Sequence, residues 1–241
     1  MQNRGMDYMR ILLRKCLGLT VLLFLTAVLW GCKRSEDVKM LTYMEDKYKE
    51  QFDAEGSYGG QLGKDYAMIQ VKSRKNPKDL ALVRISYEKD GAVFQDNYLG
   101  YLLKEQIENK IRALTEEIYG ECKVYYKVPM LVFPPTFGAD MGVDAFLRHP
   151  ASMVQVFIYP KESNVADKEE KLKALAEQFR ERGYLIKGVL SYPKEREMYD
   201  VLSGENFYRD GFDGYRATAE AIFSMAEEGF KYLKWKGVSE E

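Results

Sequence analysis

The chain has 241 residues, of which 46% are hydrophobic and 30% are charged, and its formal net charge is −1 at pH 7. This balance excludes the strongly basic surface that nucleic-acid binding requires, so we expect no nucleic-acid partner. A Walker loop, a Cys-x-x-Cys pair and a His-rich tract are all absent from the sequence, and we therefore expect no cofactor and no metal.

The N-terminal segment has the parts of an export signal. Basic residues come first, and residues 17–30 form an apolar run that is shorter than the roughly 20 residues that span a bilayer comfortably. The sequence Leu-Trp-Gly-Cys, which ends at Cys32, then resembles the lipobox of bacterial lipoproteins. In that family the cysteine receives a diacylglycerol group on its sulfur, and a dedicated peptidase then cuts ahead of it.

This resemblance implies a division of the chain and an address. Residues 1–31 would be the signal peptide, residues 32–37 a lipidated tether, and residues 38–241 a single domain. Cys32 would be the lipidation site, which places the protein at the extracytoplasmic face of the cell membrane, held there by its lipid. Two alternatives stay open, an uncleaved signal-anchor helix and an ordinary secreted protein.

The three cysteines agree with such an address. Cys16 would leave with the signal and Cys32 would carry the lipid, so Cys122 alone remains in the folded part. We expect Cys122 to be a buried thiol on a strand over residues 122–128. Because residues 1–31 hold four basic and one acidic side chain, their removal would change the net charge from −1 to −4. A net charge of −4 helps to keep a protein in solution.

The first part of the mature chain predicts a helix followed by an antiparallel meander. Helical spacing of apolar residues runs over 38–52, and a glycine-rich loop is expected over 56–64. Alternating apolar residues predict strands over 67–71, 81–87 and 92–95. The dipeptides Asn76-Pro77 and Asp90-Gly91 supply the two turns between them.

A long helix is predicted next, over residues 99–118. Its apolar stripe includes Ile111, it can begin at Asp96 or Asn97, and Gly120 stops it. We expect this helix to pack against the meander. A helix N-cap explains an aspartate at position 96 without a functional role.

Two segments of this region carry a second resemblance. The sequence Tyr-Met-Glu-Asp-Lys-Tyr-Lys-Glu-Gln-Phe begins at Tyr43, and Gln-Asp-Asn-Tyr-Leu-Gly-Tyr-Leu-Leu-Lys-Glu-Gln begins at Gln95. Together with the strands between them, they resemble uncharacterised lipoproteins and small exported proteins of Gram-positive bacteria. The resemblance covers about residues 41–128. It implies an α+β fold and a cell-surface address, and it brings no catalytic residue.

Residues 129–150 form an irregular connection, with a brief helix over 143–148. Aromatic residues on a long loop are the first place to look for a ligand, and we assign Phe133, Thr136 and Phe137 as candidate ligand-binding residues. Asp140 and Asp144 are too few oxygen ligands for a typical calcium site. The single histidine, His149, lies before Pro150 in a turn, where a structural role is expected.

The last part predicts a βαβ unit and more helices. Strands over 154–158 and 184–190 flank a helix over 172–179, and a short helix over 195–202 follows. A turn over 208–215 contains Asp210 and Asp213, which favour a turn and a helix cap over a calcium loop. We predict a final helix over 215–235.

These elements predict an α+β fold, an antiparallel meander packed with a long helix, then a βαβ unit and a C-terminal helix. The predicted function is that of a lipid-anchored cell-envelope module without catalytic activity. Its partners would be the membrane, through the lipid anchor, and an envelope protein or a small-molecule ligand. The alternative is an envelope hydrolase that uses paired carboxylates.

Overall fold

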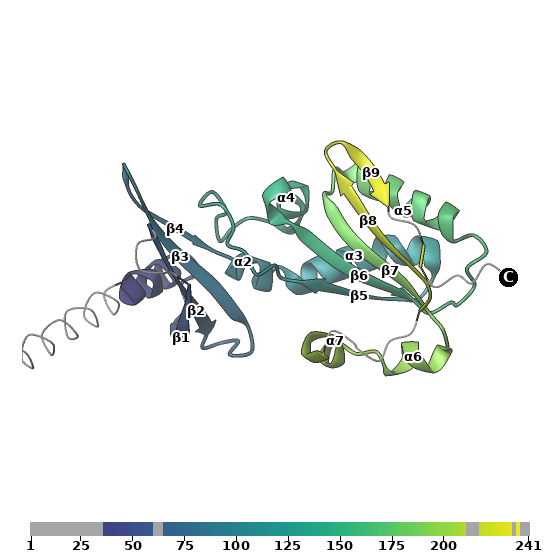
Figure 1. The fold of residues 1–241 in the computed structure, drawn as a ribbon, viewed down its shortest axis with the longest axis horizontal. Helices are drawn as coiled ribbons and strands as arrows, with labels where there is room; N and C mark the ends of the chain where they lie inside the picture. The colour runs from purple at the N-terminus through teal and green to yellow at the C-terminus, as the bar shows by residue number, and fades with distance from the viewer. Residues whose placement is uncertain (1–35, 60–64, 211–216, 233–234, 237–241) are drawn as a thin grey trace, which may run out of the picture. The chain divides into compact units, whose positions relative to one another are not determined.

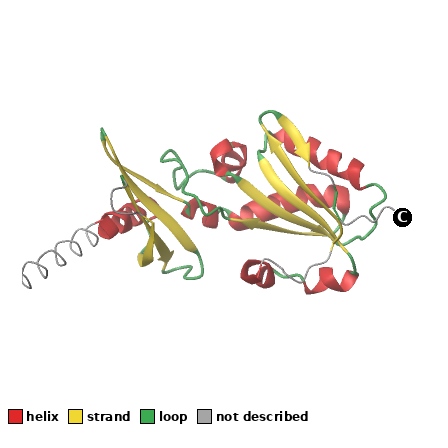
Figure 2. Cartoon of the chain, viewed as in Figure 1, coloured by secondary structure: helices red, strands yellow, loops and turns green. Residues whose placement is uncertain are grey.

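The computed structural model describes residues 36–59, 65–210, 217–232 and 235–236 of the chain. It separates into two compact units, residues 1–94 and residues 95–241, each with a β-sheet of its own (Figure 1). A single domain was expected over residues 38–241. Helices and strands occur in both units, which confirms the α+β class (Figure 2). Within the described ranges, no helix has the length and apolar character needed to cross a membrane.

The first unit holds a helix and a four-stranded sheet. Residues 36–48 are helical, and the strands are β1 (Phe52–Gly59), β2 (Tyr66–Ser73), β3 (Leu80–Glu88) and β4 (Gly91–Asp96), in the order β1-β2-β3-β4. The predicted meander and both of its turns are confirmed. Residues with an apolar side chain on alternate positions form the buried face, namely Ile69, Val71, Ala81, Val83 and Ile85. The helix contributes buried Met40 and Met44, and its Tyr43 ring stacks on Phe94 of β4.

The first strand was not predicted. The helix ends earlier than expected because Lys49 adopts a left-handed conformation, with φ of 56°. The chain then enters β1, which pairs antiparallel with β2 from Phe52 to Gly59. The sequence analysis expected a loop from residue 56, because glycine and serine are poor strand formers. Pairing with the apolar strand β2 outweighs that local preference.

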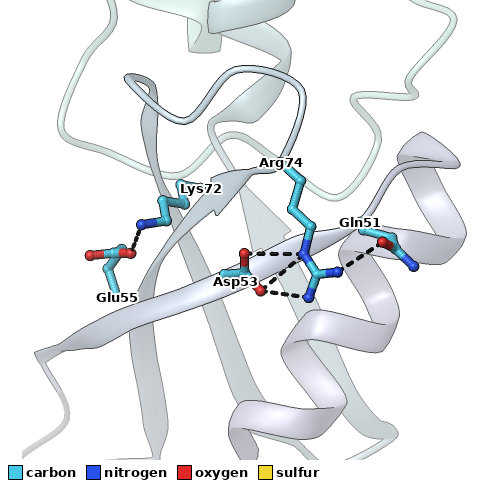
Figure 3. Close-up of polar contacts among 5 residues, drawn as sticks. All are labelled: Gln51, Asp53, Glu55, Lys72 and Arg74. Carbon is cyan, nitrogen blue, oxygen red and sulfur yellow. Dashed lines mark hydrogen bonds and ion pairs between the residues drawn. The ribbon is translucent and has the colours of Figure 1, made fainter.

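Polar side chains on β1 and β2 hold these two strands together (Figure 3). The guanidinium of Arg74 donates to both carboxylate oxygens of Asp53 at 2.8–3.1 Å and to the amide oxygen of Gln51 at 2.9 Å. The hydrogen bond from Arg74 lowers the pKa of Asp53. Lys72 forms an ion pair with Glu55 beside them. All of these groups lie at the surface, so the network is a solvated face that stabilises the pairing only slightly.

The second unit is a five-stranded mixed sheet with helices. Strands β5 (Cys122–Lys127), β6 (Val154–Pro160), β7 (Ile186–Pro193), β8 (Ala217–Ala226) and β9 (Gly229–Tyr232) follow the order β5-β6-β7-β8-β9. Strands β6 and β7 are parallel and the other pairs are antiparallel. The helices are α2 (Tyr98–Leu102), α3 (Lys104–Tyr119), α4 (Val143–Arg148), α5 (Lys168–Arg182), α6 (Arg196–Val201) and α7 (Gly204–Asp210), with a 3-10 turn at Pro150–Ser152.

Helices α3 and α5 bury one face of this sheet, which we call the inner face. Ile111 of α3 and Leu175 of α5 are fully buried in a core with Val124, Ile158 and Leu190 of the strands. The predicted βαβ unit is therefore confirmed as β6-α5-β7. The long helix has the expected stripe and stops at Gly120, and within the second unit it packs against β5.

Packing at the inner face also explains why residue 188 is a glycine. Gly188 of β7 lies directly under the ring of Phe223 on β8, and an added Cβ would overlap three ring atoms. The Phe223 ring cannot easily move aside, because it is buried and stacks on Phe179 of α5 at a centroid distance of 6.3 Å. Glycine at position 188 thus allows the aromatic ring to fill the core.

The prediction of a C-terminal helix over residues 215–235 is wrong. Strands β8 and β9 occupy the described part of this segment and turn at Gly229, whose φ is 109°. Buried residues recur at every second position of β8, as Ala219, Ala221, Phe223 and Met225. Alanine, methionine and glutamate favour helices locally, but pairing along the whole of β7 selects the strand.

Candidate functional site

The loop aromatics assigned to ligand binding lie in the core. Phe133 and Phe137 are only 2% and 1% exposed, and both rings pack edge-on against Phe146 of α4 at centroid distances of 5.3 and 5.8 Å. The expectation that these rings are exposed is wrong, because the loop folds inward to fill space beside α4. Of the three residues, Thr136 alone is exposed. The two rings therefore offer little exposed surface, and ligand binding by Phe133, Thr136 and Phe137 stays a prediction.

Asp96 lies one residue before the N-cap position of α2, which Asn97 occupies. Its carboxylate accepts a hydrogen bond of 2.9 Å from the backbone N–H of Tyr98, the first residue of α2. The neighbouring Asn97 donates its amide N–H to the carbonyl oxygen of Pro129 at 2.8 Å. Both side chains are buried. The Asp-Asn pair thus fastens the start of α2 to the loop at residue 129.

The other candidate reactive groups are also buried or hydrogen-bonded. Cys122 is buried, and desolvation raises the pKa of its thiol to about 12, which leaves no reactive thiolate near neutral pH. His149 accepts a hydrogen bond on Nδ1 from the backbone N–H two residues later, at 3.1 Å. Asp144 accepts from Lys110 at 2.7 Å and from the hydroxyl of Tyr184, and the bond from Lys110 lowers its pKa.

The structure does not gather a metal site from the part of the chain that it describes. Across those ranges, no three His, Cys, Asp or Glu side chains lie where they could share an ion. Asp140 is exposed, and Asp210 ends α7. Asp213 and the lipidation candidate Cys32 both lie outside the described residues.

The outer face of the second sheet, opposite α3 and α5, is covered over half of its width. Helices α6 and α7 lie on the β5 side of the sheet (Figure 1), and their buried side chains pack on aromatic residues of β5 and β6. Phe207 of α7 stacks on Tyr125 of β5 at a centroid distance of 4.8 Å and meets Phe157 of β6 at 4.9 Å. Tyr159 of β6 completes the set beneath the helices. We call Tyr125, Phe157 and Tyr159 the covered half of the outer face.

Polar contacts fix this cover in place. The ammonium of Lys123 on β5 donates to the carbonyl oxygens of Tyr199 and Leu202 at 2.5 and 2.7 Å, which caps the end of α6. Desolvation lowers the pKa of Lys123, against the attraction of nearby carboxylates. At the free edge of β5, Tyr208 of α7 donates its hydroxyl to the carbonyl oxygen of Tyr126 at 2.9 Å. These bonds tie α6 and α7 to the sheet.

In the described part of the chain, the other half of the outer face has no such cover. Its side chains, Lys187 and Val189 on β7 with Ile222 and Ser224 on β8, are exposed or half-buried, and Ile222 is 38% exposed. We call these four residues the uncovered half. A hollow of about 300 Å³ opens there, which we call the face hollow. The rest of its lining consists of Gln155, Gly188, Phe223, Lys231 and Tyr232.

A second hollow adjoins the first where the strands end. This end hollow, of about 250 Å³, is lined mostly by apolar side chains, among them Pro150, Met153, Leu185 and Met225. The two hollows share Lys187 and Ser224. Met153 is 44% exposed and has a φ of 48°, a conformation that is uncommon in residues other than glycine. Such backbone strain often marks a functional position.

The side chains that line the two hollows are suited to ligand binding. Their apolar groups can contact a ligand, and the Lys187 ammonium can attract an anion. Glu227 and Glu228 line the end hollow, but they are exposed consecutive residues of a turn, and Glu228 lies 3.8 Å from the ammonium of Lys231. The hydrolase hypothesis stays a prediction.

Sequence reasoning missed this surface because it assigned the C-terminal segment to a helix. With that assignment Ile222 and Ser224 cannot share a face. The alternation of Ala219, Ala221 and Phe223 with the residues between them was the available signal, and it is the period of a strand.

Comparisons with known proteins leave the function open. No protein-family model matches the chain, and no match was found among curated proteins. One similar solved structure is that of a DUF5037 family protein from Ruminococcus gnavus ATCC 29149. The match covers 80% of this chain and 93% of that chain, with 16% sequence identity and a TM-score of 0.42.

Proposed function

We propose that this protein is a lipid-anchored module of the cell envelope that binds a partner or ligand through the uncovered half of its second sheet. The lipid would be carried by Cys32, at the extracytoplasmic face of the membrane. The binding role would need no catalytic residue. The rest of the chain then serves to hold the binding surface in place.

The observation that carries the proposal is the pair of adjoining hollows around Lys187 and Ser224. Ligand sites are usually concave and largely apolar, with a few polar groups that fix orientation. Both hollows have this character. The contrast with the covered half supports the same view, because the chain buries the aromatic residues of β5 and β6 under its own helices and leaves β7 and β8 accessible.

The anchor is tested by the variant Cys32→Ala. We expect this variant to leave the lipid fraction and to lose metabolic labelling with a palmitate analogue, since the acylated sulfur is absent. Fractionation of cells that express the full chain provides the measurement. A variant that stays in the membrane with the same mobility on a gel as the parent would mean that the apolar segment itself is the anchor.

The binding surface is tested by photo-crosslinking in cells. A benzoylphenylalanine residue is placed at Ile222, on the uncovered half, and in a second strain at Leu80 of the first unit, whose exposure of 39% matches the 38% of Ile222. We expect discrete, irradiation-dependent adducts from position 222 alone. Identical adduct patterns from both positions, or none from position 222, would contradict a binding role for this surface.

A further inference from the structure

The position of Lys187 restricts the kind of ligand that the uncovered half can hold. Lys187 is exposed and lines both hollows, so this cation lies where they meet. The rest of the lining is mostly apolar, but Lys231 lines the face hollow and Glu227 and Glu228 line the end hollow, and the ammonium of Lys231 lies 3.8 Å from the carboxylate of Glu228. In the part of the chain that the structure describes, no carboxylate forms an ion pair with Lys187. Its charge is therefore available to an anionic group of a ligand.

The size of the hollows adds a second restriction. Each measures about 250 to 300 Å³, which is at the lower end of the range for a small-molecule site. A linear molecule that places side groups in both hollows uses the whole surface, while a compact molecule would fill one of them. Because Lys187 lies between the hollows, an anionic group that faces it lies within such a linear molecule rather than at its end.

We infer that the uncovered half binds an extended peptide segment with an acidic side chain flanked on both sides by apolar side chains. This inference rests on the proposed function. The acidic side chain would face Lys187, and the apolar neighbours would contact Val189 and Ile222 in one direction and Met153 and Met225 in the other. A fatty acid carries its charge at one end and matches this arrangement less well.

The test measures the affinity of defined peptides for the full chain in phosphatidylcholine nanodiscs. The probe is a blocked pentapeptide, Leu-Val-Glu-Val-Leu, with a neutral fluorophore, and its counterparts carry Gln or Lys at the centre. Fluorescence anisotropy gives each dissociation constant, and empty nanodiscs correct for binding to lipid. We expect the Glu peptide to bind about two- to fivefold more tightly than the Gln peptide, the range for an exposed ion pair.

A charge exchange identifies the contact. Lys187→Glu should reverse the order, so that the Lys peptide binds more tightly than the Glu peptide. The matched control is Lys173→Glu, which makes the same change at an exposed position on α5, behind the other face of the sheet. This control should keep the order of the wild type. An unchanged order in Lys187→Glu, or a reversed order in Lys173→Glu, would overturn the inference.

The remaining outcomes separate the inference from the proposed function. If no peptide binds while octanoate does, or while position 222 still forms adducts in cells, the peptide assignment is wrong and a binding role for the surface stands. If position 222 also forms no adducts, both fail.

Discussion

The two halves of the outer sheet face differ in what lies on them. On β5 and β6 the outward side chains include three large aromatic rings, Tyr125, Phe157 and Tyr159, which pack with side chains of α6 and α7. On β7 and β8 the outward side chains are smaller and mixed in polarity, and they stay accessible to solvent. One sheet thus carries a half that stabilises the fold and a half that is available for binding, and the size and polarity of the outward residues distinguish them.

The two halves also differ in the hydrogen bonds that their outward lysines form. Lys123 on β5 and Lys187 on β7 both point outward from the same sheet. The first is bonded to carbonyl oxygens of α6 and its C-terminal end, and the second is exposed beside two hollows. A lysine can therefore be part of the folded structure or part of a binding surface, depending on whether the chain provides acceptors for it.

Removal of a ring from the cover should have the largest effect on stability. Phe207→Ala takes away a buried side chain that contacts Tyr125 and Phe157, and we expect a loss of about 3 to 5 kcal/mol in the free energy of unfolding. Ile222→Ala, on the uncovered half, should cost less than about 1 kcal/mol. Urea titration followed by circular dichroism measures both, and equal losses would remove the distinction between the halves.

The two lysines should differ by a smaller amount. Lys123→Met leaves the carbonyl oxygens of Tyr199 and Leu202 without their donor, and we expect a loss of about 1 to 3 kcal/mol. The matched variant Lys187→Met should stay within about 0.5 kcal/mol of the parent. The same urea titration measures the free energy of unfolding of both variants. A Lys187 variant as unstable as the Lys123 variant would mean that the uncovered half also supports the fold.

Alkaline pH should act on the covered half. Burial raises the pKa of Tyr125 to about 12 from its usual 10. Because the folded state holds this proton more tightly, its contribution to stability is complete below pH 10 and is lost as the pH rises from 10 to 12. Tyr125→Phe removes this contribution, so the free energy of unfolding should fall less steeply over that window. A slope equal to that of the parent would show that Tyr125 ionises freely in the folded state.

Much of this fold could be predicted from local patterns. The alternation around Ile69 and Val83, the turns at residues 76–77 and 90–91, and the stripe of α3 each give a signal within a few residues of sequence. The strand at Cys122 and the βαβ unit were predicted for the same reason. Such elements have local preferences that agree with their tertiary surroundings.

The elements that were missed depend on distant partners. Strand β8 is selected by pairing with β7, some thirty residues earlier, and β1 by pairing with β2 across a glycine-rich stretch. The burial of Phe133 and Phe137 depends on α4, which closes over the loop. The alternation in β8 could have indicated a strand, but the uncovered half also depends on the pairing of β7 with β8, which local sequence does not specify.

The central claim is that one half of the outer face supports the fold and the other binds. A single paired measurement tests it most directly. Benzoylphenylalanine is placed at Val189, and adduct formation in cells is compared for the parent, Ile222→Asp and Phe207→Ala, with the unfolding free energy of each protein measured alongside. We predict that Ile222→Asp loses the adducts and keeps its stability to within about 1 kcal/mol, while Phe207→Ala loses stability and keeps the adducts in the fraction that remains folded. Adducts that persist in Ile222→Asp, together with a large loss of its stability, would contradict the account.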